Sequence, residues 1–234
     1  MVQCIRIDRG ALLVYLGGFA AGCRTAPGPV IPEAARPVSH DDVAAWVDST
    51  IPPHQQLHRF KWLLRDERGS AGGRGSVRVA PPDSLRLDVA GPFGSGTASA
   101  VVVGEHPLWT DPPDAISRLV PNYPLMWAMF GITRPPPGGV ELRGLVNGST
   151  LAWQYAGATD TVEYARTTGD SGRLIAEVRQ SGELIGRVET SLAPDNTPLK
   201  ARLTVPSAPA QLDLTFLSTD RDSFASAIWL PRRP

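Results

Sequence analysis

The sequence predicts a mainly β protein with one strongly curved antiparallel sheet, a half-open barrel of about ten or eleven strands. Apolar and polar residues alternate along many short segments, as they do in strands with one buried and one solvated face. The 23 glycines and 23 prolines suit short strands joined by turns. Helical segments are too few to alternate with the strands as βαβ units. The expected exceptions are a short N-terminal helix and a helical lid or plug at about 112–132.

The N-terminal segment, residues 1–22, has the layout of a signal peptide. Arg6 and Arg9 form a short basic region, and an apolar run follows them. The run ends in Ala20-Ala21-Gly22-Cys23, which resembles the lipobox of bacterial lipoproteins, with alanine in place of the usual leucine. The resemblance implies cleavage before Cys23 and lipidation of its thiol. The alternatives are an ordinary secretory signal and an N-terminus that is apolar by chance.

Residues 23–38 are expected to form a lipid-anchored tether. Four of residues 24–37 are prolines, which favour extended polyproline geometry. The other cysteine, Cys4, lies in the predicted signal peptide, so the folded domain has no free thiol, which suits an oxidising periplasm. In the enterobacterial lipoproteins that the lipobox resembles, aspartate after the lipidated cysteine retains the protein in the inner membrane. Arg24 therefore implies a periplasm-facing place on the outer membrane.

The folded domain, expected over residues 39–234, opens with a short amphipathic helix. Ser39 or Asp41 can cap its N-terminus, where acidic residues are favourable. Pro52 and Pro53 lie beyond the helix and end it.

Strands make up most of the domain after this helix. Alternation is most regular at 76–79, 85–89, 200–205 and 212–216, and weaker at 57–65, 98–104, 150–156, 160–167, 173–180 and 183–192. The predicted turns between strands include Gly72-Gly73, Asp83-Ser84, Gly148-Ser149 and Ser181-Gly182.

The middle of the chain breaks this pattern with two predicted helices. One begins at Asp111-Pro112 and stops before Pro121, and the other covers 124–132 and is apolar on every side, as in a buried helix. It is interpreted either as a core helix that fills the concave face, or as a plug that moves aside for an apolar ligand. The predicted lining of the apolar cavity and lid is Leu125, Met126, Trp127, Met129, Phe130, Ile132, Leu85, Leu87 and Val89.

Residues 84–96, SLRLDVAGPFGSG, resemble the outer-membrane lipoprotein receptors of the LolB family, in which a strand enters a Pro-Leu-Gly loop. Weaker similarity continues through Arg143-Gly144-Leu145 and the later strands, and at the level of the fold it extends to the carrier family LolA. The resemblance implies a curved sheet with a helical lid over an apolar concavity. It also implies that Pro92, Phe93 and Gly94 form a loop that delivers cargo to the membrane, with Phe93 in place of the family's leucine.

Several other functional classes are disfavoured. Basic and acidic residues number 23 each, so the chain lacks the basic excess of a nucleic-acid-binding domain. The motifs G-x-S-x-G, H-E-x-x-H and the P-loop are absent from the sequence, so we expect no enzyme and no catalytic residues. His54 and His58 have helical ligand spacing but lie in a predicted strand with no third ligand, and we interpret them as surface histidines. We expect no metal and no cofactor.

The function expected from these observations is non-enzymatic lipid handling. A lipid-anchored periplasmic protein would bind the acyl chains of lipoproteins or another lipid in the half-barrel and deliver them to the outer membrane. A periplasmic carrier protein is a further expected partner. The alternative is an envelope scaffold whose sheet and loops bind protein, with the concavity filled as ordinary core.

Overall fold

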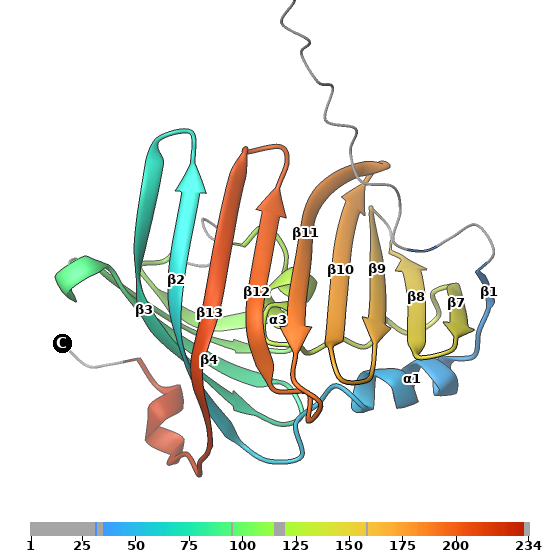
Figure 1. The fold of residues 1–234 in the computed structure, drawn as a ribbon, viewed down its shortest axis with the longest axis horizontal. Helices are drawn as coiled ribbons and strands as arrows, with labels where there is room; N and C mark the ends of the chain where they lie inside the picture. The colour runs from blue at the N-terminus through green and yellow to red at the C-terminus, as the bar shows by residue number, and fades with distance from the viewer. Residues whose placement is uncertain (1–30, 32–34, 95, 115–119, 158, 232–234) are drawn as a thin grey trace, which may run out of the picture.

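The computed structural model describes residues 31, 35–94, 96–114, 120–157 and 159–231. These described residues form one antiparallel sheet of 13 strands in the order β1-β7-β8-β9-β10-β11-β12-β13-β2-β3-β4-β5-β6 (Figure 1). The predicted fold class is confirmed, although the strand count is higher than expected. The sheet stays open, because β1 and β6 are its two edges.

The bounds of the elements agree with most of the predicted segments. The strands before the middle segment are β1 (Arg36–Pro37), β2 (Gln56–Asp66), β3 (Gly69–Ala80), β4 (Ser84–Ala90), β5 (Thr97–Val103) and β6 (His106–Asp111). The later strands are β7 (Leu142–Asn147), β8 (Thr150–Ala156), β9 (Asp160–Thr167), β10 (Gly172–Gln180), β11 (Glu183–Leu192), β12 (Pro198–Val205) and β13 (Ala210–Arg221). The helical elements are α1 (His40–Asp48), η1 (Pro92–Gly94), α3 (Tyr123–Ala128) and η2 (Ser226–Trp229).

Two runs of hairpin-connected strands build the sheet, and pairing of the last long strand with the first long strand joins them. β2 to β6 form one run and β7 to β13 the other. β13 pairs with β2 in a register that sets Phe216 opposite Phe60, and the register shifts between Phe216 and Ser218. The curved sheet therefore has one continuous inner face, made from both halves of the chain.

Alternation along the strands separates the buried inner face from the outer face. In β10, for example, Leu174 and Ala176 are fully buried in the main apolar cluster, while Arg173, just before Leu174, is exposed. The largest fully buried side chains include Trp127, Trp153 and Tyr164. The core thus lies within the concavity of the sheet.

Helix α1 begins as the sequence predicts. The side chain of Ser39 accepts a hydrogen bond from the backbone N–H of Asp42 at 3.1 Å, which caps the helix. Val43 and Val47 are buried, and the ring of Trp46 lies 5.8 Å from that of Trp153 on β8. These contacts hold α1 against the β8 end of the sheet.

The predicted turn at Gly72-Gly73 is wrong, because both glycines lie inside β3. The physical reason is close packing rather than chain reversal. A Cβ atom at Gly73 would lie 2.0 Å from the carbonyl oxygen of Ala90, and one at Gly75 would lie 2.6 Å from the ring of Phe60. Glycine is needed here so that β4 and the aromatic side chains of β2 can approach the backbone of β3.

The end of the predicted tether is also part of the fold. Arg36 and Pro37 form β1 and pair with Gly144 and Arg143 of β7, while Ala35 is buried against the sheet. The guanidinium of Arg143 donates to the carbonyl of Ala35 at 2.8 Å. Proline at this position is compatible with the sheet because β1 is an edge strand.

Candidate functional site

Helix α3 lies in the concavity of the sheet and contacts β10 and β11 (Figure 1). Leu125, Met126, Trp127 and Ala128 are each no more than 1% exposed, as expected for a helix that is apolar on every side. The helix is shorter than predicted, since it ends at Ala128 rather than at Ile132.

The early end has a local cause at Gly131. This glycine has a φ of +80°, in the left-handed region that closes a helix and that other residues rarely adopt. Met129 and Phe130 follow the helix as a buried turn, and Ile132, also buried, lies just beyond it. In the other predicted helix, residues 112–114 form a bend and turn, and the remaining residues, 115–119, lie outside the described part of the chain.

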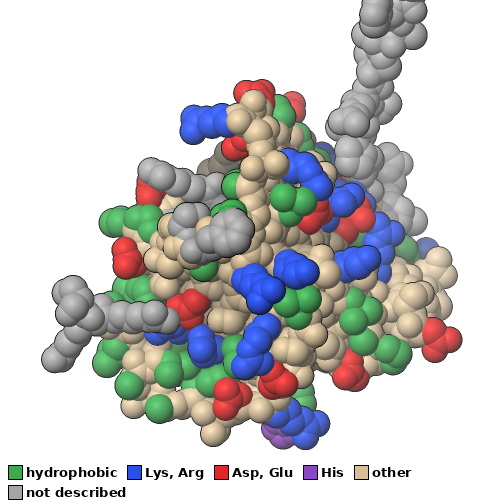
Figure 2. Space-filling view, turned by 60° about the vertical axis from the view of Figure 1, so that its left-hand side comes forward, with side chains coloured by type: hydrophobic (Ala, Val, Ile, Leu, Met, Phe, Trp, Pro, Cys, Tyr) green, Lys and Arg blue, Asp and Glu red, His purple; other side chains and the backbone are tan. Residues whose placement is uncertain are grey.

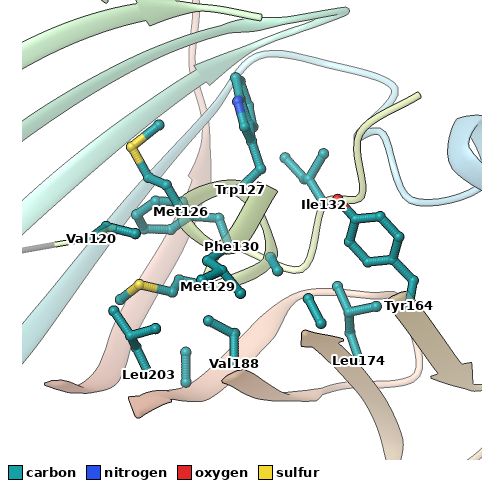
Figure 3. Packing of buried hydrophobic residues seen from close by; sticks show 14 of the residues in the cluster. Val120, Met126, Trp127, Met129, Phe130, Ile132, Tyr164, Leu174, Val188 and Leu203 are labelled. Atoms are coloured by element: carbon teal, nitrogen blue, oxygen red, sulfur yellow. The ribbon is translucent and has the colours of Figure 1, made fainter. Parts of the chain in front are cut away.

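The segment from α3 to Ile132 is packed against aromatic and aliphatic side chains from both halves of the sheet. Figure 3 shows it surrounded by residues such as Tyr164, Val188 and Leu203. The ring of Phe130 lies 6.3 Å from the rings of both Phe60 and Phe216. These distances are typical of favourable aromatic pairs.

Two side-chain hydrogen bonds tie α3 to its surroundings. The indole N–H of Trp127 donates to the carbonyl of Gly104 at 2.7 Å, and the hydroxyl of Thr190 on β11 donates to the carbonyl of Ala128 at 2.7 Å. Every other contact described above for this helix is apolar. The helix is therefore held mainly by non-directional packing, which another apolar group could supply.

A buried arginine follows this segment. Arg134 is 7% exposed, and its guanidinium lies 4.9 Å from the centre of the Trp127 ring, within cation–π range. Its backbone N–H donates to the hydroxyl of Tyr164 at 3.3 Å, while its side-chain Nε has no hydrogen-bond partner among the described residues. Burial raises the pKa of Tyr155 and of Tyr164 well above the usual range, so both are neutral hydroxyls. Among the described residues, the indole N–H of Trp153 in the same cluster is also buried without a partner, so the apolar site contains at least two buried groups that can donate.

The inner face is not fully covered over β2 and β4. Trp62, Leu64, Leu87 and Val89 point to the same side as the buried core but are only half-buried, and they pack against it. We call these four residues the inner apolar strip. β2 ends and β3 begins at the same end of the strands, and β4 runs toward that end until Ala90 pairs with Arg74, so the strip leads from the α3 cluster to the turn after β4. It provides an apolar surface that is continuous with the core and reaches solvent.

All nine residues predicted for the cavity and lid belong to this one hydrophobic cluster. Leu85 and the six residues from the middle segment are buried, whereas Leu87 and Val89 are half-buried on the inner apolar strip. Trp62 and Leu64 were not among the predicted residues. Their alternation with Lys61, Leu63 and Arg65 could have identified them, but the apolar Leu63 on the outer face obscures the period.

The predicted delivery loop lies where β4 meets β5. Pro92, Phe93 and Gly94 form the short turn η1, and the backbone N–H of Gly91 donates to the carbonyl of Gly96 at 3.0 Å. Gly94 is exposed and has a φ of +78°, which explains the glycine there. The side chain of Phe93 lies outside the described atoms, so its predicted role stays a prediction.

The interpretation of both histidines as surface residues is wrong for His58. His54 is exposed, but His58 lies on the inner side of β2, is 1% exposed and shares a hydrogen bond of 2.8 Å between Nδ1 and the hydroxyl of Thr219. Its ring meets that of Phe216 edge-on at 5.9 Å. Burial lowers the pKa of His58 to about 4, so the ring is neutral at physiological pH.

The described part of the chain contains no cluster of three or more His, Cys, Asp or Glu residues that could hold a metal ion. No helix within those same residues has the length and apolar character needed to cross a membrane. The predicted signal peptide and the lipidation site Cys23 lie outside the described residues.

No protein-family model and no curated protein sequence matches this chain. Solved structures do match it. A domain from Vibrio parahaemolyticus, described as an outer membrane lipoprotein-sorting protein domain, superposes with a TM-score of 0.53 at 9% identity. The match covers 82% of this chain and 97% of that one. A LolA superfamily protein from Nitrosomonas europaea gives a TM-score of 0.48 at 10% identity, over 83% of this chain and 98% of that one.

At such low identity the similarity concerns the fold alone, and the match to the Vibrio domain is the one that supports a shared fold. Its match extends over almost its whole length and over most of the present chain. The chain therefore shares the fold of the Vibrio domain, which agrees with the kind of fold that the sequence resemblance implied.

Proposed function

We propose that the concave face of the sheet binds the acyl chains of a lipid or lipoprotein and that the protein delivers them to the outer membrane without catalysing a reaction. The observation that carries this proposal is the inner apolar strip, Trp62, Leu64, Leu87 and Val89, which is half-buried and continuous with the buried cluster around α3. A core that served packing alone would gain by covering these side chains. An acyl chain would cover them.

In this proposal α3 occupies the ligand's place until a ligand arrives. Leaving the concavity would cost the helix its two side-chain hydrogen bonds and its apolar contacts, and acyl chains would replace the apolar contacts. The unpartnered Nε–H of Arg134 supplies a donor for an ester or amide oxygen at the polar end of the ligand.

Mass spectrometry of the gently purified full-length chain tests this function. We expect lipids with acyl chains to co-purify in a fixed ratio to protein. A Leu87→Arg variant should reduce their amount, because it places a charge on the strip. Protein that is free of lipid, and that fails to take up an added acyl probe, would contradict the proposal and favour a scaffold role.

We also propose that the chain is anchored through Cys23 to the periplasmic side of the outer membrane. A Cys23→Ser variant should lose all incorporation of radioactive palmitate and remain an uncleaved precursor, because a serine hydroxyl is a much weaker nucleophile than the cysteine thiol that would receive the lipid group. A Cys4→Ser variant is the matched control and should be labelled normally. Equal labelling of the Cys23→Ser variant would reject this anchor.

The turn η1 is proposed to assist release at the membrane. If Phe93 is exposed there, a Phe93→Glu variant should keep its melting temperature within a few degrees but lose transfer of bound cargo to liposomes. A Phe93→Leu variant, which keeps an apolar side chain, should retain transfer. A collapse of the melting temperature in the glutamate variant would instead place Phe93 in the core and remove the role in delivery.

A further inference from the structure

A line of basic and hydroxyl side chains crosses the outer face of the sheet, on the side away from α3. Neighbouring strands set these residues opposite one another in register, and every one is exposed. We call this line the cationic row; in spatial order it is Arg173, Ser191, Lys200, Thr215, Lys61 and Arg74. Since strands lie about 4.8 Å apart, the row spans roughly 24 Å across six strands. No carboxylate lies within it.

The charges of the row are largely available to a partner. Lys61, Arg74 and Lys200 form no ion pair with any residue that the structure describes, whereas Arg173 pairs with Glu189. Lys61 and Lys200 are the only two lysines in the sequence. In a chain whose formal net charge is zero, the row is a local concentration of positive charge.

The nearest acidic residue on β13 does not neutralise the row. Asp213 is bound by Arg65 at 2.6 Å and by Arg202 at 2.7 Å, and this pairing leaves one cation in excess. These three residues, Glu189 and every member of the cationic row except Arg74 border a hollow of about 740 Å³ over β2, β13, β12, β11 and β10. Lys and Arg side chains also gather near the middle of the surface drawn in Figure 2.

Two exposed leucines lie beside the row. Leu199 is the extra residue at the register shift between β11 and β12, where Ser191 pairs with Lys200 and Leu192 with Pro198, so it lies outside the regular alternation and is 48% exposed. Leu217 lies two residues beyond Thr215 on β13 and is 53% exposed. Leu217 falls at the register shift between β13 and β2, which leaves it without a partner position on the neighbouring strand. Exposed apolar side chains next to cations are typical of surfaces that lie on an anionic bilayer. Binding of a soluble polyanion would not require them.

We infer that this outer face docks on the anionic phospholipid head groups of a membrane surface. The lysine and arginine side chains would contact phosphate groups, with Ser191 and Thr215 donating hydrogen bonds between them. Leu199 and Leu217 would enter the head-group region. This site is on the opposite side of the sheet from the concavity, and the inference does not depend on the proposed binding of acyl chains.

Co-sedimentation of the full chain with vesicles tests the inference. The test variant is Lys61→Gln/Arg74→Gln/Lys200→Gln, and the matched control Arg36→Gln/Arg68→Gln/Arg221→Gln removes the same charge from exposed arginines outside the row. Vesicles contain either phosphatidylcholine alone or equal parts of phosphatidylcholine and phosphatidylglycerol. All proteins carry the same N-terminal segment, so its contribution to binding cancels in the comparison.

The row variant should bind the phosphatidylglycerol vesicles about a hundredfold more weakly than the native chain, while the control variant should change far less. Raising the salt concentration to about 1 M should remove this difference, because charges are then screened within about 3 Å. At about 1 M salt the native chain should keep some vesicle binding through its exposed leucines, and a Leu199→Ser/Leu217→Ser variant should lose this residual binding. Equal binding of the row variant and the native chain would overturn the inference. Binding of soluble polyglutamate, but not of the anionic vesicles, would do so too, by identifying an acidic protein as the partner.

Discussion

Replacing Met129 by arginine is expected to lower the free energy of unfolding by several kcal/mol and to abolish binding of a fluorescent acyl probe. Met129 is 2% exposed and belongs to the apolar cluster that fills the concavity. A guanidinium at this position would either remain buried without a matching charge or force the segment after α3 out of the sheet. Chemical denaturation and probe titration measure the two effects separately.

A conservative variant separates packing from charge. Met129→Leu keeps the volume and apolar character of the side chain and should cost less than about 1.5 kcal/mol, with probe binding retained. Leu87→Arg, at a half-buried position of the inner apolar strip, should lose probe binding at a smaller cost in stability. A Met129→Arg chain that is stably folded and binds the probe normally would mean that this segment is not part of a ligand site.

Acidification is expected to remove about 3 kcal/mol of stability between pH 7 and pH 4 through His58 alone. Burial lowers the pKa of His58 to about 4 in the folded protein, against an ordinary value near 6.5 in the unfolded chain. The unfolded state therefore takes up a proton first as the pH falls. The contribution of neutral His58 to the free energy of unfolding is complete above about pH 6.5 and is lost as the pH approaches 4.

Urea unfolding across this pH range, with a His58→Gln variant as the control, measures the effect. Glutamine can still bond to Thr219 but does not titrate, so the variant should lack the loss of stability between pH 6.5 and 4.5. The other three histidines, His40, His54 and His106, are exposed and are present in both proteins. An identical pH dependence in the two proteins would contradict the buried, neutral state of His58.

Strand periodicity predicted much of this fold because the position of a residue along a strand determines which face of the sheet its side chain lies on. The alternation at 85–89 and 200–205 appears in the structure as β4 and β12, with Leu85 and Leu203 fully buried. The apolar segment after residue 123 was likewise expected in the concavity, since no polar face was available to contact water.

The errors have a common origin in contacts between distant parts of the chain. Gly73 looks like a turn residue until Ala90 of β4 is placed against its backbone, and that pairing is not local. His58 looks exposed in sequence, but β13, more than 150 residues later, covers it with Phe216 and Thr219. The cationic row is equally non-local, because its six residues come from six strands and only the register brings them into line.

Cross-linking with a photoactivatable fatty acid tests the central claim most directly. A full-length chain that binds acyl chains in its concavity should give cross-links, mapped by peptide mass spectrometry, to the inner apolar strip and to the α3 segment. Trp62, Leu87 and Met129 are the positions expected to react. Competition by an unlabelled fatty acid should remove these cross-links. An absence of cross-links within the concavity, with labelling confined to the outer face or the N-terminal segment, would contradict the account.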